Sequence, residues 1–547
     1  MTDTAPNMAD YEATRQAFDL EVPERFNYAR DVIDAWARTD SDRLALLAVG
    51  PDGGASQRLT FADLRQRSNR AAAFLAELGV APGDPLFVML PRVPAWYDVL
   101  LGAFKLGAVP MPGTVQLQPA DIAYRIGQAE ATVAITDQTG VAKVNAALEG
   151  CPTLTHLITT GAGSGEWRSL DDGMADAADI PAVHDTAASD PLLIYFTSGT
   201  TGYPKMVLHT HASYGIGHQI TARFWHDLGP DDLHWTVSDT GWAKAAWGKL
   251  FGQWSIGAGV FLWDAPGKPD LDLMLRMIGN HGVTTFCAPP TVYRGLVQLD
   301  LSRYDLSSLR HCTAAGEPLN PETFHAWKAA TGMEIHDGYG QTETVNVLAN
   351  YRCLPKKPGS TGKPAPGFEV AVLDGDLRVL EAGNEGQIAI RVRPTRPVGL
   401  FAEYWRDEAA NDNAFQGDWY LTGDRAYVDE DGYFWFVSRD DDLIISAGYR
   451  IGPFEVESAV IEHPAVAETA VIGIPDAQRG QVVKAFVVLV GGYEPSDQLA
   501  REIQDHVRSA TAPYKYPRHI EFIDELPKTV SGKIRRVELR EREAAAD

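Results

Sequence analysis

Cysteine is scarce in this sequence. The 547 residues include four cysteines, Cys151, Cys287, Cys312 and Cys353, and none of them forms a Cys-x-x-Cys pair. Four scattered cysteines in a chain of this length are too few for a disulfide framework, and they lack the spacing of a zinc ribbon. The pattern therefore favours a reducing compartment.

Positive charge and long hydrophobic runs are also in short supply. The chain has 48 Lys and Arg against 73 Asp and Glu, a formal net charge of −25. So acidic a surface repels phosphate backbones, which argues against nucleic-acid binding but not against a local basic nucleotide pocket. The most apolar uncharged stretch, residues 250–263, is shorter than the roughly 20 residues that cross a bilayer. The N-terminus has neither the basic start nor the apolar core of a targeting signal. We expect a soluble cytoplasmic protein without a membrane span.

What the sequence does contain is an alternation of helical and strand patterns. Residues 61–78 carry apolar side chains at helical spacing, and the apolar run 85–90 predicts a buried strand. Further helical stretches follow near 95–106 and 119–129. This rhythm favours an α/β fold in which parallel or mixed sheets are flanked by helices.

The end of the chain has a different pattern, which predicts a small α+β domain. Helical spacing covers residues 454–461 and 497–510, and strand patterns cover 466–474, 482–490 and 518–523. The charged segment 438–442 precedes this region. We therefore expect a large N-terminal domain, residues 1–438, followed by a small C-terminal domain, residues 443–547.

Three predicted strands run into loops of unusual composition. Residues 191–197 lead into SGTTGYPK, residues 309–315 into GEPLN, and residues 333–336 into DGYGQTE. Ligands of open α/β sheets bind beyond the carboxyl ends of the strands. We expect the three loops to form one composite site.

The clearest motif is the segment 197–205. Its two glycines free the backbone so that N–H groups can converge on an anion, and its hydroxyls and lysine add donors for phosphate oxygens. It lacks the Gly-Lys-Ser/Thr ending of a Walker A loop. A polar surface turn is the alternative. The residues are Thr197, Ser198, Gly199, Thr200, Thr201, Gly202, Tyr203, Pro204 and Lys205.

Three further motifs are each a weaker indication of a nucleotide site when taken alone. In the segment 337–343, an aromatic residue between glycines can stack on a base, while a hydroxyl and a carboxylate suit phosphate and Mg²⁺. Asp424, in YLTGD at an expected strand end, can accept hydrogen bonds from ribose hydroxyls, as the acidic residue of dinucleotide folds does. Lys533, in PKTVSGK, is a charge that can reach an anionic transition state. Solvated turns and an exposed tail lysine are the alternatives.

In this order, the motifs resemble those of the acyl-adenylate-forming enzymes, and in particular of the medium-chain acyl-CoA synthetases. Residues 238–242 (SDTGW), 447–453 (AGYRIGP), 455–457 (EVE) and 511–518 (TAPYKYPR) also resemble that group. The resemblance covers essentially the whole chain. It implies an ATP-dependent acid–CoA ligase: a carboxylate attacks the α-phosphate of MgATP, which yields acyl-AMP and diphosphate, and coenzyme A then displaces AMP.

The resemblance also implies roles for individual residues. Residues 197–205 would enclose the phosphates, Tyr339 would stack on the adenine, Thr342 would touch the α-phosphate and Glu343 would hold Mg²⁺. Asp424 would bind the ribose with Arg439 beside it, and Lys533 would bridge carboxylate and phosphate. The other residues of the implied ATP site are Gly316, Glu317, Pro318, Asp337, Gly338, Gly340 and Gln341.

For the second half-reaction, the resemblance implies a mobile C-terminal domain that swings about a hinge at residues 439–442, centred on Asp441. The swing would bring a coenzyme A site to the reaction centre, with Ala447, Gly448 and Tyr449 along the pantetheine tunnel and Arg479, Tyr516, Pro517 and Arg518 at the nucleotide end. The chain departs from the usual pattern at Tyr203, where a basic residue is frequent, and at Ser438, where glycine is usual.

The acid is inferred from a single position. Acetate-specific relatives carry a tryptophan directly after the stacking aromatic residue, where this chain has Gly340. We expect a deeper pocket and a medium-chain fatty acid or an aryl carboxylate as substrate. Trp242 and Trp247 are candidate walls of the acyl pocket, and a role in the core is equally open for both.

Other functions stay open as alternatives. They are an adenylation enzyme that loads a carrier protein, a luciferase-like oxygenase, an acyl-nucleotide sensor, and a zinc site formed by His209, His211 and His218. No cysteine or carboxylate lies at ligand spacing near those histidines. We also expect a homodimer, and a lysine acyltransferase that would acylate Lys533 and so remove the charge used in adenylation.

Overall fold

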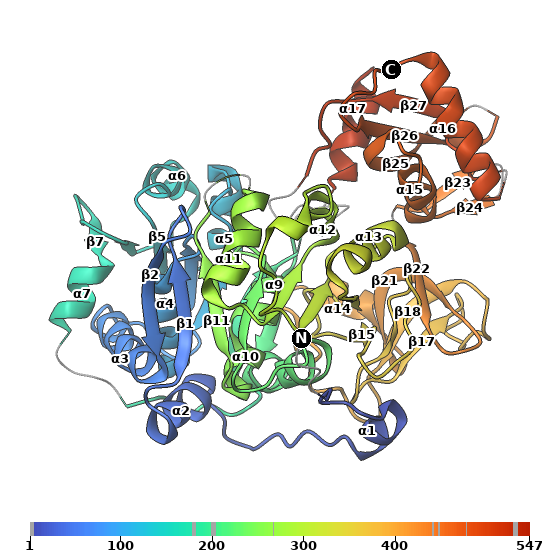
Figure 1. Ribbon diagram of the computed structural model, residues 1–547. Coiled ribbons are helices and arrows are strands. Elements are labelled where there is room, and N and C mark those ends of the chain that lie inside the picture. Colours follow the sequence, from blue (N-terminus) through green and yellow to red (C-terminus); the bar gives the residue numbers. More distant parts are fainter. Residues whose placement is uncertain are drawn as a thin grey trace.

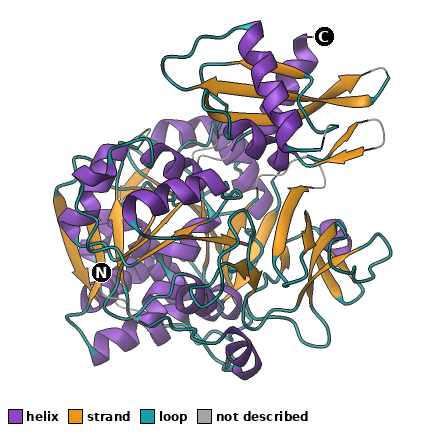
Figure 2. Ribbon diagram, turned by 45° about the vertical axis from the view of Figure 1, so that its right-hand side comes forward, coloured by secondary structure: helices purple, strands orange, loops and turns teal. Residues whose placement is uncertain are grey.

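The computed structural model describes residues 5–546 except residues 178–181, 198–203, 266, 268, 440–441, 447–448, 477, 513 and 529–533. The chain forms a large α/β body with mixed sheets and a smaller α+β domain at its C-terminal end, which Figure 1 shows as a separate lobe. Figure 2 shows the helices around the strands of the body. The predicted fold class is confirmed.

A nine-stranded mixed sheet forms the centre of the body. Pairing is parallel from β14 through β13, β12, β10 and β11 to β1, and antiparallel strands close both ends. Every residue of β10 to β13 is buried, as expected for parallel strands covered on both faces. In spatial order the strands are β16 (Lys363–Pro364), β15 (Leu348–Ala349), β14 (Ile335–Tyr339), β13 (His311–Ala314), β12 (Thr285–Ala288), β10 (Leu233–Thr236), β11 (Gly259–Trp263), β1 (Leu44–Val49) and β2 (Ala55–Thr60).

A second sheet of the body is parallel throughout. Helices connect most of its strands, and a short loop, residues 160–166, joins the last two. Its spatial order is β4 (Val109–Pro112), β3 (Pro85–Met89), β5 (Val133–Thr136), β6 (His156–Thr159) and β7 (Trp167–Ser169). The helices of this part are α3 (Phe61–Glu77), α4 (Pro94–Leu106), α5 (Pro119–Ala129), α6 (Val141–Ala147) and α7 (Leu170–Asp176).

Local signals in the sequence define the ends of these helices. Thr60 and Asp63 form a reciprocal capping box at the start of α3. Helix α4 begins with Pro94 and ends at Gly107, whose φ of 72° is the left-handed conformation that glycine adopts at little cost. Buried Lys105 near the end of α4 donates to Asp34 at 2.8 Å, which anchors the helix to the N-terminal region.

Two antiparallel sheets complete the body. One consists of β8 (Pro191–Phe196), β9 (Met206–Thr210) and β19 (Glu403–Tyr404). The other has the order β17 (Val370–Leu373), β18 (Gly386–Arg391), β21 (Trp419–Val428) and β20 (Phe415–Gln416), and β22 (Phe434–Arg439) pairs with β21. The remaining helices of the body are α1 (Tyr11–Ala17), α2 (Asp34–Thr39), α8 (His218–Ile220), α9 (Ala243–Lys249), α10 (Phe251–Ile256), α11 (Leu271–His281), α12 (Pro290–Leu296), α13 (Pro321–Thr331) and α14 (Glu408–Ala414).

The strand before the predicted phosphate loop is not part of a parallel sheet. β8 pairs antiparallel with β9, so the two strands form a hairpin around the loop. The N–H of Thr197 donates to the carbonyl of Lys205 at 3.0 Å and closes its base. Antiparallel neighbours can be joined by such a short connection without a crossover helix.

The C-terminal domain has its own hydrophobic core. Its sheet has the order β24 (Tyr449–Ile451), β23 (Ile444–Ser446), β26 (Gly480–Leu489) and β25 (Val466–Asp476), with β27 (His519–Phe522) parallel to β26. Helices α15 (Pro453–Ile461), α16 (Asp497–Ala510) and α17 (Arg536–Ala546) accompany it. On α16, Leu499, Ile503 and Val507 recur every four residues and are buried, which explains why this polar helix docks on the sheet.

Few polar contacts join this domain to the body. Asn320 donates to the hydroxyl of Ser458 at 3.0 Å, and the rings of Phe436 and Phe454 meet edge to face. β22 ends at Arg439 and β23 begins at Ile444. The boundaries at 438 and 443 stay predictions, and Asp441 lies outside the described residues.

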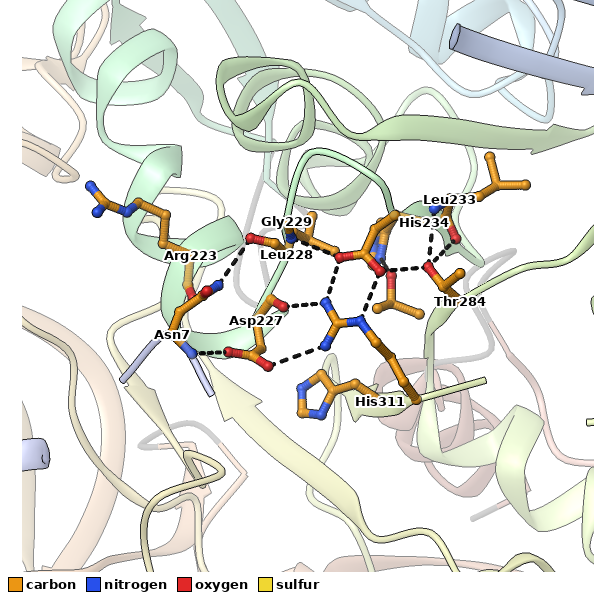
Figure 3. A network of polar contacts seen from close by, with 12 residues as sticks. Asn7, Arg223, Asp227, Leu228, Gly229, Leu233, His234, Thr284 and His311 are labelled. Atoms are coloured by element: carbon orange, nitrogen blue, oxygen red, sulfur yellow. Dashed lines mark hydrogen bonds and ion pairs between the residues drawn. The ribbon is translucent and has the colours of Figure 1, made fainter. Parts of the chain in front are cut away.

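A buried ionic network holds the N-terminal segment against the body (Figure 3). The N–H of Asn7 donates to Asp227 at 2.7 Å, and Asp227 also accepts from Arg310 at 3.2 Å. Arg310 extends to Asp232, whose second partner is the hydroxyl of Thr284 at 2.7 Å. Figure 1 shows this segment, with α1 and α2, on the side of the body opposite the C-terminal lobe. Breaking such buried pairs typically costs about 3–5 kcal/mol.

No helix in the described ranges combines the length and the apolar character needed to span a bilayer.

Buried histidines make the fold sensitive to acid. Burial lowers the pKa of His209, His211 and His234 to about 3 and that of His311 to about 4. It also lowers the pKa values of His218, His226 and His336 well below the ordinary value. The unfolded chain therefore takes up protons below pH 6.5 that the folded chain excludes.

We expect the free energy of unfolding to fall as the pH drops below 6.5, by up to about 1.4 kcal/mol per buried histidine and pH unit. Urea unfolding at pH 7.5, 6.5 and 5.5 measures this. His218→Gln should flatten the slope, whereas His519→Gln, at an exposed position, should not. Equal slopes for the two variants would contradict this account.

Candidate active site

A cavity of about 690 Å³ lies where the carboxyl end of β14, the β8–β9 hairpin, β21 and the C-terminal domain meet. It collects most of the described residues of the predicted ATP site. These are Thr197, Lys205, Gly316, Glu317, Pro318, Asp337, Gly338, Tyr339, Gly340, Gln341, Thr342, Glu343, Asp424 and Arg439. The carbonyl of Pro204 accepts from Tyr124 at 3.1 Å. Ser198, Gly199, Thr200, Thr201, Gly202, Tyr203, Ala447, Gly448 and Lys533 lie outside the described residues.

Asp424 organises one wall of the cavity. Its Oδ2 accepts from the hydroxyl of Tyr339 at 2.7 Å and from the side-chain amide of Gln341 at 2.6 Å. Asp424 lies within β21 rather than at a strand end, because pairing with β22 continues and places it opposite Arg439. The guanidinium of Arg439 is 3.8 Å from Oδ1. The contacts restrict the ring of Tyr339 to one orientation.

Glu343 is buried in the opposite wall. Its Oε1 accepts from the hydroxyl of Tyr404 at 2.8 Å, and the ammonium of Lys205 lies 4.7 Å from the centre of the Tyr404 ring. Burial raises the pKa of Glu343 above its ordinary value, and the Tyr404 hydroxyl opposes this shift. Tyr404 therefore joins the loop lysine to a buried carboxylate.

The loop that follows β13 forms the third wall. The carboxylate of Glu317 accepts from the N–H of Thr291 at 2.8 Å and from Arg294 at 3.1 Å. Lys244 donates to the carbonyl of Ala315 at 2.7 Å, and burial lowers its pKa. Burial raises the pKa of Asp337 well above its ordinary value.

The charge balance of the cavity differs from that of the whole chain. Among the described lining residues, five are Lys or Arg and six are Asp or Glu. The chain as a whole has 48 Lys and Arg residues and 73 Asp and Glu residues. This relative enrichment in positive charge suits an anionic ligand such as a nucleotide.

Trp247 occupies the space beside Gly340. A Cβ on Gly340 would lie 2.2 Å from the Trp247 ring and 2.6 Å from the carbonyl of Val345. Trp242 lines the same cavity. The glycine therefore makes room for an indole from α9, and Trp247 determines the depth of the cavity at this point.

Residues of the C-terminal domain close the cavity. Ile534 and Arg536, which follow Lys533 in the sequence, both line it. Arg536 donates twice to Glu457, at 2.7 and 2.8 Å, and lies 3.8 Å from Asp442. The start of α17 is thus turned towards the cavity.

Of the predicted coenzyme A residues, those that the structure describes are not among the residues that line the cavity. Tyr449 is exposed and stacks on Tyr514 at 4.2 Å. Arg518 donates to the hydroxyl of Tyr516 at 3.2 Å. The positive charges of Arg479 and Arg518 lower the pKa of Asp476, after its hydrogen bonds to the N–H groups of residues 478 and 479. Pro517 lies between Tyr516 and Arg518 in the sequence and is buried.

Sequence reasoning missed several cavity residues. Lys244, Arg294, Tyr404 and Arg536 line the cavity and belong to no segment with an evident phosphate or base signature. Arg536 alone had a usable signal, because it follows Lys533 by three residues. The candidate zinc histidines do not converge: no group of three or more metal-ligating side chains suited to a metal occurs in the described part of the chain.

Comparisons with known proteins agree with this architecture. The family model of the AMP-binding enzymes matches residues 33–405, and that of the AMP-binding enzyme C-terminal domain matches residues 455–533. Acyl-coenzyme A synthetase ACSM3, mitochondrial, of Mus musculus is 46% identical over 99% of this chain and 95% of its own. Acyl-coenzyme A synthetase ACSM4, mitochondrial, of Homo sapiens is 44% identical over 99% of this chain and 94% of its own. The chain belongs to the AMP-binding enzymes, in their acyl-coenzyme A synthetase family.

Solved structures of similar proteins are CoA ligases. The anthranilate CoA ligase AuaEII, in complex with anthranoyl-AMP, superposes with a TM-score of 0.88 at 32% identity, over 96% of this chain and 99% of its own. A benzoate CoA ligase from Burkholderia xenovorans LB400 superposes with a TM-score of 0.83 at 29% identity, over 94% and 100%.

The packing of Trp247 against Gly340 can be tested by stability. We expect Gly340→Ala to lower the free energy of unfolding by about 1–3 kcal/mol, because the methyl group collides with an indole and a backbone carbonyl. Adding Trp247→Leu should recover part of that loss in a double-mutant cycle. Gly375→Ala is the control, since nothing lies within 4 Å of its Cβ. A Gly340→Ala variant as stable as the control would contradict this geometry.

Proposed function

We propose that this protein is an ATP-dependent acid–CoA ligase that makes acyl-CoA, AMP and diphosphate through an acyl-adenylate, with medium-chain fatty acids as its acids. One observation carries the proposal. A single cavity unites the segment 337–343, Asp424, Lys205 and the residues that follow Lys533, Ile534 and Arg536. These are the parts that adenylation requires together.

The cavity suits ATP in the following arrangement. Tyr339 stacks on the adenine, with Gly316 to Pro318 at its edge. Asp424 binds the ribose through its carboxylate, next to Arg439, and Thr342 and Lys205 meet the phosphates. The hydrogen bonds from Tyr339 and Gln341 support this role, because they hold the carboxylate in place before the nucleotide arrives.

Glu343 fits a Mg²⁺ site. It is a buried carboxylate that lines the cavity, as does Thr342, the residue before it, and Mg²⁺ prefers such oxygen ligands. When bound, the ion would neutralise phosphate charge. The chain's own residues position the reactants and exclude water, which accounts for most of the catalysis expected in transfers at phosphorus.

A swing of the C-terminal domain between half-reactions agrees with two features. Ile534 and Arg536 line the cavity, which is the arrangement that would bring Lys533 to the acid and the α-phosphate. Tyr449, Tyr516 and Arg518 are absent from the described lining, so contact with coenzyme A at the reaction centre requires another arrangement. Rotation about Asp441 would supply it.

The acid is chosen at the Trp242–Trp247 end of the cavity. The relatives named acyl-coenzyme A synthetases favour a fatty acid, whereas the anthranilate and benzoate ligases favour an aryl acid. Trp247, packed beside Gly340, gives this end of the cavity an apolar wall. Such a wall suits both the chain of a fatty acid and the ring of an aryl acid. The medium-chain acid is the first choice, and the aryl acid is the alternative.

Three further features stay predictions. The relatives are named mitochondrial, so the cytoplasmic location has no independent support. The homodimer and the acylation of Lys533 by a lysine acyltransferase are equally untested.

The experiment is diphosphate release from MgATP with acids from C2 to C12 and with benzoate, each with and without coenzyme A. We expect release with medium-chain acids, and thioester only when coenzyme A is present. A maximum with benzoate would show that the substrate is an aryl acid and not a medium-chain fatty acid. No release with any acid would contradict the ligase itself.

Lys533→Ala separates the half-reactions in the same assay. It should stop diphosphate release and retain thioester formation from supplied acyl-AMP. Loss of both activities would contradict the role of Lys533 and its proposed regulation by acylation.

Asp424→Asn should raise the KM for ATP by about 10- to 100-fold and leave the KM for the acid unchanged. The reason is that charge-assisted hydrogen bonds to a ligand contribute about 1.5–3 kcal/mol each. Asp429→Asn is the control, since Asp429 bonds Lys357 and Trp435 outside the cavity. An equal effect on both substrates would contradict the ribose assignment.

A further inference from the structure

Three consecutive backbone carbonyls of the segment 342–344 are each held by a different part of the chain. The carbonyl of Thr342 accepts from the imidazole Nε2 of His209 at 2.8 Å and from the hydroxyl of Tyr214 at 2.6 Å. That of Glu343 accepts from the N–H of Phe401 at 2.8 Å. That of Thr344 accepts from the indole N–H of Trp247 at 3.1 Å.

The Thr342 carbonyl is the most constrained of the three. A carbonyl oxygen has two lone pairs, and the two buried side chains use both. Because a peptide unit is planar, fixing this oxygen also fixes the N–H of Glu343. The carbonyl of Glu343 is held as well, so both peptide units around Glu343 are oriented, and with them the direction in which its side chain leaves the backbone.

His209 is held in the orientation that this bond needs. A carbonyl only accepts, so Nε2 carries the proton and Nδ1 accepts from the hydroxyl of Ser213, 3.0 Å away. Ser213 is in turn bonded reciprocally to Thr210 at the start of the π-helical turn η3 (His211–Ile216). The Tyr214 ring stacks on the imidazole, with 3.3 Å between ring centres.

His209 is therefore not a proton carrier. Burial lowers its pKa to about 3, so it is neutral at physiological pH, and both ring nitrogens are engaged. Neither His209 nor Tyr214 is among the described residues that line the cavity. Both act from behind the segment that faces it.

His209 also connects this segment to the phosphate loop. It lies on β9, four residues after Lys205, and β9 pairs on its other side with β19, which carries Tyr404. β9 begins directly after Lys205. Its His209 bonds the backbone of Thr342, and its partner strand β19 carries Tyr404, which bonds the carboxylate of Glu343.

We propose that His209 and Tyr214 are positioning residues for adenylation: together they hold the Thr342–Glu343 peptide in register with the phosphate loop. The inference rests on the proposed function, because that function gives Thr342 and Glu343 their part in the reaction.

The test is Tyr214→Phe, which removes one hydroxyl and keeps the ring against His209. We expect the kcat of diphosphate release to fall about tenfold, the lower end of what losing a supporting partner costs. Thioester formation from supplied acyl-AMP and the KM for the acid should be unchanged.

Tyr28→Phe is the matched control. Tyr28 is equally buried, packs on Phe251 as Tyr214 does, and donates to two backbone carbonyls, those of Leu250 and Phe251, outside the cavity. Tyr28→Phe should lower the thermal stability as much as Tyr214→Phe does, and it should keep the wild-type rate of diphosphate release. If Tyr214→Phe behaves like Tyr28→Phe, or slows both half-reactions alike, the proposal is overturned.

A second pair of variants tests the imidazole. His209→Gln can still present an N–H to the Thr342 carbonyl, whereas His209→Met cannot. We expect the glutamine variant to retain several times more adenylation activity than the methionine variant. Equal activities would count against the proposal.

Amide hydrogen exchange tests the same idea without turnover. Residues 341–345 should exchange faster in Tyr214→Phe than in the wild type and in Tyr28→Phe. Unchanged exchange there would overturn the inference while leaving the ligase assignment intact. A wild-type enzyme that adenylates no acid would instead contradict the proposed function.

Discussion

Hydrogen bonds from buried side chains to backbone carbonyls hold together a site whose parts come from separate sheets. β14 belongs to the nine-stranded sheet, β9 and β19 to the three-stranded sheet, and β21 to a five-stranded one. Among the strands that the structure describes, no ladder of pairing runs through all three sheets. His209, Tyr214, Trp247 and Gln341 supply the connections, since each donates to a carbonyl of a neighbouring element. Such bonds contribute about 1 kcal/mol each, but a buried carbonyl left without its donor costs more, so the arrangement tolerates little displacement.

Burial explains why these donors can work. Inside the body, imidazoles stay neutral, carboxylates such as Glu343 and Asp337 have raised pKa values, and lysines such as Lys244 have lowered ones. An acidic chain with a nearly balanced cavity also discourages nonspecific polyanions while admitting a small one.

Much of the fold could be predicted from periodicity. The helix at 497–510 and the strands near 466–474 and 482–490 occur within two residues of their expected bounds, because each has an apolar face of clear period. The pairing of β8 was not anticipated, since an apolar run before a glycine-rich loop looks the same in a parallel sheet and in a hairpin. Asp424 was expected at a strand end and lies inside β21, because the partner strand β22 extends the ladder beyond Gly423. Tyr404 carried no recognisable signal, since its role depends on the pairing of β19 with β9.

The sequence by itself determined which chemical groups are present and in what order: a hydroxyl-rich loop with a lysine, an aromatic residue between glycines followed by Thr342 and Glu343, and an aspartate. These are local patterns, and local composition dictates backbone freedom and donor type. The tertiary structure decided which of these groups and their supporting side chains come into contact. Trp247 fills the space that Gly340 leaves, and His209 meets the carbonyl of Thr342 across 133 positions of sequence. Such contacts depend on how sheets pack, and no spacing along the chain encodes that distance.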